Sequence, residues 1–207
     1  MLKSYEELSP IAIDCLKEIG NIGSSYAASS MSTMLSKSVE MHVPEVRLMD
    51  FQSVIDEMGG PEKVIAGILV DLSGDIEGMI MFLLEESFTK IVLDTLMGRQ
   101  HINLTELDEA DISAIIEMGN IMAGSYIGAI SSLSGLSVKM AVPSMTVDMM
   151  GAVMDLPIIE FSKVGDKVLF IDDGFIIDNI DIKSNIILVP TVESLDILMK
   201  KLGVSDD

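Results

Sequence analysis

An internal repeat constrains this chain more than any other feature of its sequence. A shift of 99 positions within the 207 residues (residue 18 to residue 117) places Glu-Ile-Gly-Asn-Ile at 18–22 against Glu-Met-Gly-Asn-Ile at 117–121. The same shift aligns two further pairs of segments, 38–41 with 137–140 and Val43-Pro44 with Val142-Pro143. About ten identities in roughly thirty positions exceed what a shared helical pattern alone would give. We therefore expect one duplicated domain over 1–207, with repeats of approximately 9–98 and 106–203.

Each repeat is predicted to begin with a long helix and to continue into strands and a further helix. Ser9 followed by Pro10 is typical of a helix start, and Gly98 is typical of a helix end. Helices are expected over 10–35, 85–97, 106–133 (ending before Gly135), 148–154 and 191–202. Strands are expected over 39–49 with an interruption at Pro44, 63–72, 76–84 after a tight turn at Ser73-Gly74, 137–147, 168–171 and 176–189. This order predicts a mixed α/β (α+β) fold with pseudo-twofold symmetry, in which helices cover a largely antiparallel sheet.

One face of each long helix carries polar residues at equivalent positions. At about 100° per residue, four positions of each helix share a stripe roughly 60° wide. The first stripe consists of Asp14, Glu18, Asn21 and Ser25, and the second stripe of Ser113, Glu117, Asn120 and Gly124. Asparagine is a poor helix former, so keeping it in mid-helix twice is locally unfavourable, and positions that break local rules are often functional.

Glycine inside these helices costs about 1 kcal/mol relative to alanine. Gly20, Gly23, Gly119 and Gly124 nevertheless occur there. They indicate either a close approach of another part of the protein or an open surface for a partner.

Composition excludes several classes of function. The formal charge of −20 gives no basic surface for nucleic acid, and no apolar run approaches the ~18 residues that cross a bilayer. One cysteine, Cys15, rules out an internal disulfide framework and, with the absence of a signal-like N-terminus, favours the cytoplasm. The two histidines, His42 and His101, show no metal-ligand spacing, and no glycine-rich phosphate loop follows a strand.

The two stripes have a shared spacing that is specific. Each reads Asp or Ser, three residues, Glu, two residues, Asn, twenty-two residues and Pro, ending at Pro44 and at Pro143. This pattern resembles the signature of the CheC/CheX/FliY family, phosphatases of the phosphorylated chemotaxis regulator CheY, and two complete copies resemble its CheC branch. The first copy departs from that branch, which commonly has Gly then Asn where this chain has Ser25-Tyr26.

The resemblance implies a hydrolase that acts on an aspartyl phosphate and needs no cofactor of its own, because Mg²⁺ sits on the regulator. Asn21 and Asn120 would hold the attacking water, since an amide both accepts and donates hydrogen bonds. Glu18 and Glu117 would pair with the regulator's active-site lysine. Four further residues would support them: Asp14, Ser113, Pro44 and Pro143.

The resemblance also implies a second partner, the receptor deamidase CheD, which we expect near Asp148, in the segment 148–155. A non-catalytic adaptor that binds the regulator or the deamidase is the alternative, although an adaptor would tolerate loss of the Glu/Asn pairs. A flagellar-switch component is less favoured, because FliY-like proteins carry a further C-terminal domain.

Overall fold

The computed structural model describes residues 2, 4–100, 102–161 and 167–204. In these residues the chain forms six α-helices: α1 (Pro10–Leu35), α2 (Phe51–Glu57), α3 (Glu86–Met97), α4 (Glu109–Ser134), α5 (Met150–Phe161) and α6 (Val192–Lys201). It also forms eight strands: β1 (Val39–Met41), β2 (Glu45–Asp50), β3 (Val64–Gly74), β4 (Gly78–Leu84), β5 (Val138–Met140), β6 (Ser144–Met149), β7 (Lys167–Ile177) and β8 (Ile180–Pro190). No helix of the described residues is both long and apolar enough to cross a membrane.

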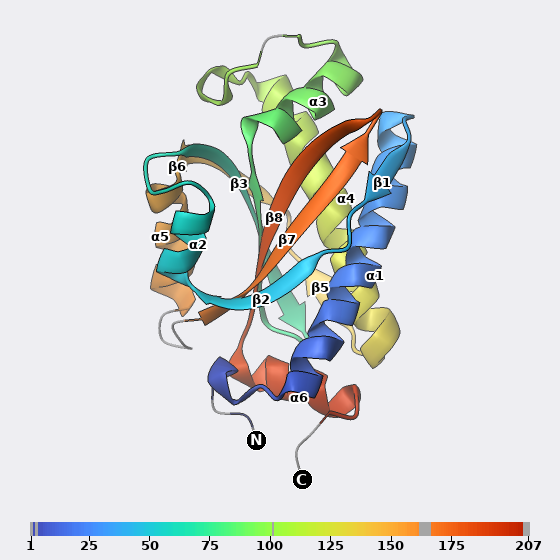
Figure 1. Ribbon diagram of the computed structural model, residues 1–207, viewed down its shortest axis with the longest axis vertical. Helices are drawn as coiled ribbons and strands as arrows, with labels where there is room; N and C mark the ends of the chain where they lie inside the picture. The colour runs from blue at the N-terminus through green and yellow to red at the C-terminus, as the bar shows by residue number, and fades with distance from the viewer. Residues whose placement is uncertain (1, 3, 101, 162–166, 205–207) are drawn as a thin grey trace.

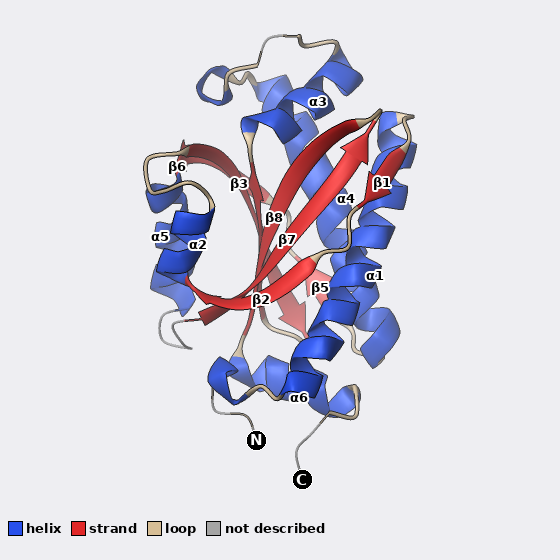
Figure 2. Ribbon diagram, in the orientation of Figure 1, coloured by secondary structure: helices blue, strands red, loops and turns tan. Residues whose placement is uncertain are grey.

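The eight strands form one curled antiparallel sheet in which the two repeats are interleaved (Figure 1). The main path runs β1-β7-β8-β4-β3-β5, while β2 also pairs with β7 and β6 also pairs with β3. Strands β1 and β2 of the first repeat therefore pair with a strand of the second, and β5 and β6 pair with a strand of the first. Helices cover the sheet (Figure 2), so the predicted fold class is confirmed.

Two hydrophobic cores lie on the two faces of the sheet. Helices α1 and α4 pack side by side on one face, and α2 and α5 pack together on the other (Figure 1). The side chains of β4 alternate between them, with Ile80 and Phe82 in the α1–α4 core and Met79 and Met81 in the α2–α5 core. Because both faces are covered, residues 78–84 form a continuous apolar run in the sequence.

The ends of the long helices follow the predicted capping chemistry. The Ser9 side chain accepts a hydrogen bond from a first-turn amide of α1, and Gly98 and Gly135 adopt left-handed conformations after α3 and α4. Helix α4 begins three residues later than expected, because Asp108 and Asp111 form a capping box that fixes its first turn.

The predicted turn at Ser73-Gly74 is wrong. Strand β3 continues to Gly74, and residues 75–77 form the connection to β4. The end of β3 pairs with β5 and is therefore held in the sheet. A Cβ at Gly74 would lie 2.5 Å from the Ser137 carbonyl oxygen, and φ is +101° there, so this close pairing requires glycine.

The predicted interruption between 171 and 176 is also wrong. Strand β7 runs through it to Ile177, and the chain reverses at Asp178-Asn179, both with positive φ. The segment resembles a turn because it contains Asp173 and Gly174, but the Asp173 carboxyl is buried among hydrogen-bond partners from two helices. Helix α2 was not predicted, and α5 is longer than the short helix expected over 148–154.

Candidate active sites

Both stripes lie on the outer faces of their helices. In α1 the opposite face is buried, including Leu16, Gly20 and Ala27. The first stripe has three exposed members and a half-buried Asn21, and the second has three exposed members and a half-buried Asn120. The two helices thus present equivalent rows of polar groups to solvent.

The central groups of both stripes have no partner within the described chain. No described residue hydrogen-bonds or forms an ion pair with the side chain of Glu18, Asn21, Glu117 or Asn120. Asp14 differs, because its carboxylate lies 2.9 Å from Lys17 Nζ. Two carboxylates and two amides therefore make no hydrogen bond or ion pair with the described part of the chain.

The helix glycines fall into two groups that differ in what surrounds them. A Cβ at Gly23 would lie 2.5 Å from the ring of Tyr126, and one at Gly119 would lie 2.7 Å from Ile68. Such distances are too short for any side chain, so these glycines allow close packing. At Gly124 a Cβ would meet nothing within 4 Å. Its bare backbone leaves the end of the second stripe open.

The two prolines anchor equivalent loops beside the stripes. Pro44 lies between β1 and β2, is buried, and comes within 3.9 Å of where a Cβ on Gly20 would be. Pro143 lies buried between β5 and β6. Two residues before each proline, the backbone N–H donates to the sheet at 2.9 Å, from His42 to Gly174 and from Ala141 to Asp71.

A buried polar cluster lies beneath the helices. The Ser24 hydroxyl of α1 is 2.8 Å from the Tyr126 hydroxyl of α4, and both donate to the Asp173 carboxyl of β7. Burial raises the pKa of Asp173 to about 6, although the hydrogen bonds from Tyr126 and Ser24 act in the opposite direction. Sequence reasoning missed this cluster because its members are far apart in the chain.

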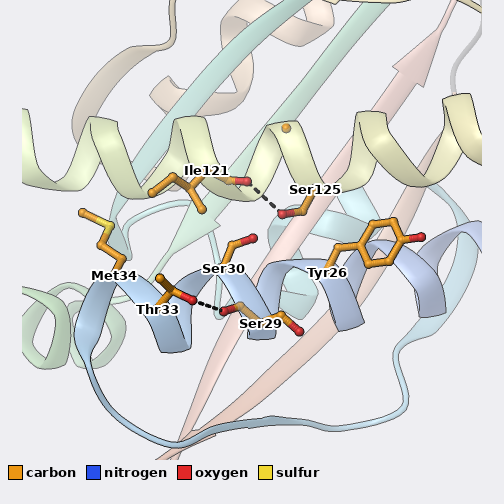
Figure 3. A pocket seen from close by; sticks show the side chains of 8 residues that line it. Tyr26, Ser29, Ser30, Thr33, Met34, Ile121 and Ser125 are labelled. Carbon is orange, nitrogen blue, oxygen red and sulfur yellow. Dashed lines mark hydrogen bonds between the residues drawn. The ribbon is translucent and has the colours of Figure 1, made fainter.

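A surface groove of about 670 Å³ lies between α1 and α4, next to the second stripe (Figure 3). Its lining carries no charge and comprises Tyr26, Ser29, Ser30, Thr33, Met34, Ile121, Gly124 and Ser125. Figure 3 shows that two of its hydroxyls point back to their own helices, where Thr33 donates to the Ser29 carbonyl and Ser125 to the Ile121 carbonyl. The lining depends on how two distant helices pair, so the sequence did not reveal it.

The remaining site prediction, Asp148, lies apart from the stripes. Asp148 is exposed near the end of β6, whereas Pro143, which flanks the second stripe, precedes the start of that strand. The Asp148 carboxylate accepts a hydrogen bond from the Met149 N–H at 2.7 Å. Within the described ranges, no three His, Cys, Asp or Glu side chains are placed to hold a metal ion. His101 lies outside the described residues.

Comparisons with known proteins match most of the chain. A sequence profile of the CheC-like family matches residues 11–47, which include the first stripe and Pro44. The chain is 31% identical over 197 residues to the CheY-P phosphatase CheC of Bacillus subtilis (strain 168), covering 93% of this chain and 94% of that protein. It is 27% identical over 143 residues to the flagellar motor switch phosphatase FliY of the same organism, covering 69% of this chain and 37% of that protein. Its fold is similar to that of Thermotoga maritima FliY, with a TM-score of 0.76, 23% identity, and coverage of 95% of this chain and 98% of the other.

Proposed function

The chain belongs to the CheC-like family, and we propose that it is a phosphatase that hydrolyses the aspartyl phosphate of a CheY-like response regulator. One observation carries this proposal: two equivalent sets of solvent-facing Glu and Asn side chains have no partner among the described residues. In the reaction, water attacks the phosphorus atom, inorganic phosphate leaves, and the regulator's aspartate carboxylate is regenerated.

Asn21 and Asn120 position the attacking water in this mechanism. Phosphoryl transfer passes through a loose transition state that requires little base and accurate positioning. Each amide oxygen accepts a hydrogen bond from the water, and each amide N–H₂ donates to an oxygen nearby. The half-buried position of both residues limits their side-chain motion. Holding the water in line contributes about 10²-fold, or ~2.7 kcal/mol.

Glu18 and Glu117 bind the partner instead of acting as bases. Their carboxylates are exposed and have no cationic neighbour within ion-pair distance among the described residues, so each is available to the regulator's lysine. Asp14 and Ser113 lie one helical turn earlier and support this contact. Pro44 and Pro143 hold the loops that flank each asparagine.

We propose that Mg²⁺ belongs to the regulator and that this chain supplies no metal ligands. Its stripe carboxylates stand singly beside amides, whereas a Mg²⁺ site uses clustered oxygen ligands. Calorimetric titration of the protein with Mg²⁺ alone should give nothing tighter than millimolar. A micromolar site would overturn this part of the proposal.

A CheD-like deamidase is proposed as a second partner, in the cytoplasm, at the segment 148–155. This segment contains Asp148 and the exposed Met149 and lies at the end of β6 and the start of α5. It is separate from the stripes, so one molecule can contact both partners. The alternative role of a pure adaptor is not favoured, because it gives no reason for two sets of unpaired Glu and Asn.

The test is the decay of a phosphorylated CheY-like regulator with and without this protein. We expect faster decay in proportion to protein concentration, with release of inorganic phosphate. Unchanged decay together with tight binding would replace the phosphatase by the adaptor.

A further inference from the structure

We infer that Val43 and Val142 are apolar contacts through which this protein binds the phosphorylated regulator, an inference that rests on the proposed function. Among the described residues these two valines are the most exposed large hydrophobic side chains, at 83% and 88%. Single exposed apolar residues are normal on a protein surface. Two at equivalent positions of a duplicated fold, each beside an active-site stripe, require a common cause.

Their position beside the asparagines follows from the loop anchors. Pro44, next to Val43, is buried against α1 at Gly20, and the N–H of His42 is bound to β7. Of the four residues of the first stripe, Asn21 is the closest to Gly20 in helical angle, at about 100°. The loop that carries Val43 therefore lies on the side of α1 that is nearer to Asn21 than to the other three residues of the stripe.

The second loop repeats this arrangement. The N–H of Ala141 is bound to β3, Pro143 is buried, and α4 packs along β5 and β6 as α1 packs along β1 and β2. Both valines thus extend into solvent from anchored backbone. A contact that is already fixed in place loses little conformational entropy on binding.

The fold does not require valine at these positions. A residue before proline favours extended backbone, which Val and Thr both adopt readily. Outside the Val-Pro pair the loops have diverged, with His42 against Ala141 and Glu45 against Ser144. Packing within this chain accounts for the prolines, which are buried. It does not account for the valines, which remain largely exposed.

The regulator is the partner that fits this pattern. Each valine recurs together with the Glu and Asn of one stripe and the Pro of the adjacent loop. The molecule that contacts a stripe is therefore the one expected to contact the valine of that loop. The chain has a charge of −20, and the phosphoryl group is also anionic, so long-range attraction does not assist binding. Apolar burial stabilises a complex without this repulsion.

The test replaces both valines by threonine, which keeps the shape of the side chain and its preference for extended backbone. We expect the KM for the phosphorylated regulator to rise about tenfold, equal to about 1.4 kcal/mol, with kcat unchanged within about twofold. Calorimetric binding to the regulator should weaken by the same factor. The matched control is Ile180→Thr, which changes a 54%-exposed apolar residue after the β7–β8 turn and should alter neither quantity.

The outcomes separate this inference from the proposed function. An active wild-type protein whose KM and affinity are unaffected by the two threonines would overturn the valine contact and leave the phosphatase standing. An equal loss in Ile180→Thr would overturn it as well. A wild-type protein that binds without hydrolysis, and loses affinity only in the threonine variant, would refute the phosphatase and support the contact. Absence of any binding would refute both.

Discussion

The two stripes lie on equivalent helices and loops, but the side chains around them differ. Both lie on 26-residue helices, and both are flanked by a loop anchored by a buried proline. The side chains at four equivalent positions nevertheless differ: Asp14 and Ser113, Lys17 and Ile116, Ser25 and Gly124, Glu40 and Lys139. The two halves thus share Glu and Asn at equivalent positions, while the residues around them differ.

The cores beneath the helices differ as well. Glu45 of β2 and Ser144 of β6 are equivalent in the repeat, and they pair with Asp172 and Leu69 respectively. The next residue in each partner strand, Asp173 and Val70, is therefore also equivalent. In the same alignment Ser24 of the buried cluster corresponds to Ala123. One half of the molecule therefore has a titratable group where the other half is apolar.

The largest expected effect comes from this buried difference. Burial raises the pKa of Asp173 from the ordinary 3.8 to about 6, so the folded protein holds the proton more tightly than the unfolded chain. The resulting stabilisation is fully present below about pH 4 and is lost as the pH rises through about 6. A shift of about two pKa units corresponds to about 3 kcal/mol.

Urea unfolding of the wild type and Asp173→Asn across this range isolates the effect, because the other carboxylates titrate in both proteins. The free energy of unfolding of the wild type minus that of the variant should fall by about 2.5 kcal/mol between about pH 4 and pH 7. A difference that does not change with pH would mean that Asp173 keeps an ordinary pKa.

The next effect tests what the two stripes have in common. Asn21→Ala combined with Asn120→Ala should lower regulator dephosphorylation about 10²-fold, because no amide remains to hold the water. Both side chains lack partners among the described residues, so the thermal unfolding temperature should hardly change. Ser29→Ala combined with Ser132→Ala, on the same two helices, serves as the control and should remain active. Full activity of the asparagine variant would refute the water-positioning mechanism.

The long helices, the start of α1 at Ser9 and the ends of α3 and α4 at Gly98 and Gly135 could be predicted from the sequence, because each depends on local spacing. The Ser24–Tyr126–Asp173 cluster could not, because it joins residues 102 and 149 positions apart. The turn between β7 and β8 was misplaced for the same reason, since Asp173 is an apparent turn residue that tertiary hydrogen bonds hold in a strand. The groove of Figure 3 likewise depends on how α1 packs against α4.

A smaller effect separates the two stripes. Equal sites would each supply half of the activity. Ser25 places a side chain where Gly124 leaves open surface, and an interface packed to native density is sensitive to one added heavy atom. We therefore expect Asn120→Ala to lower activity about fivefold and Asn21→Ala less than about twofold.

Removing the extra side chain tests the cause of this inequality. In an Asn120→Ala background, where only the first stripe acts, Ser25→Gly should raise activity about twofold. Thermal unfolding controls for the cost of a new glycine within a helix. Equal losses in the two single asparagine variants, without any gain from Ser25→Gly, would refute the steric explanation and leave the phosphatase assignment intact.

The smallest effect concerns charge. The segment 40–45 carries Glu40 and Glu45, whereas the equivalent 139–144 carries Lys139 and no acidic residue. In the proposed complex, an anionic phosphoryl group would therefore meet a less repulsive surface at the second stripe. Glu40 and Lys139 are both exposed, and exposed charges contribute little and are screened beyond about 8 Å at physiological salt.

Glu40→Lys with only the first stripe active should raise kcat/KM about twofold at low salt, and Lys139→Glu with only the second active should lower it about twofold. Because the cause is electrostatic, both changes should disappear at about 0.5 M salt, where the Debye length is only a few ångströms. Changes that persist at high salt would assign the difference to contacts of the substituted side chains, and the inequality of the two sites would then rest on packing at Ser25 and Gly124.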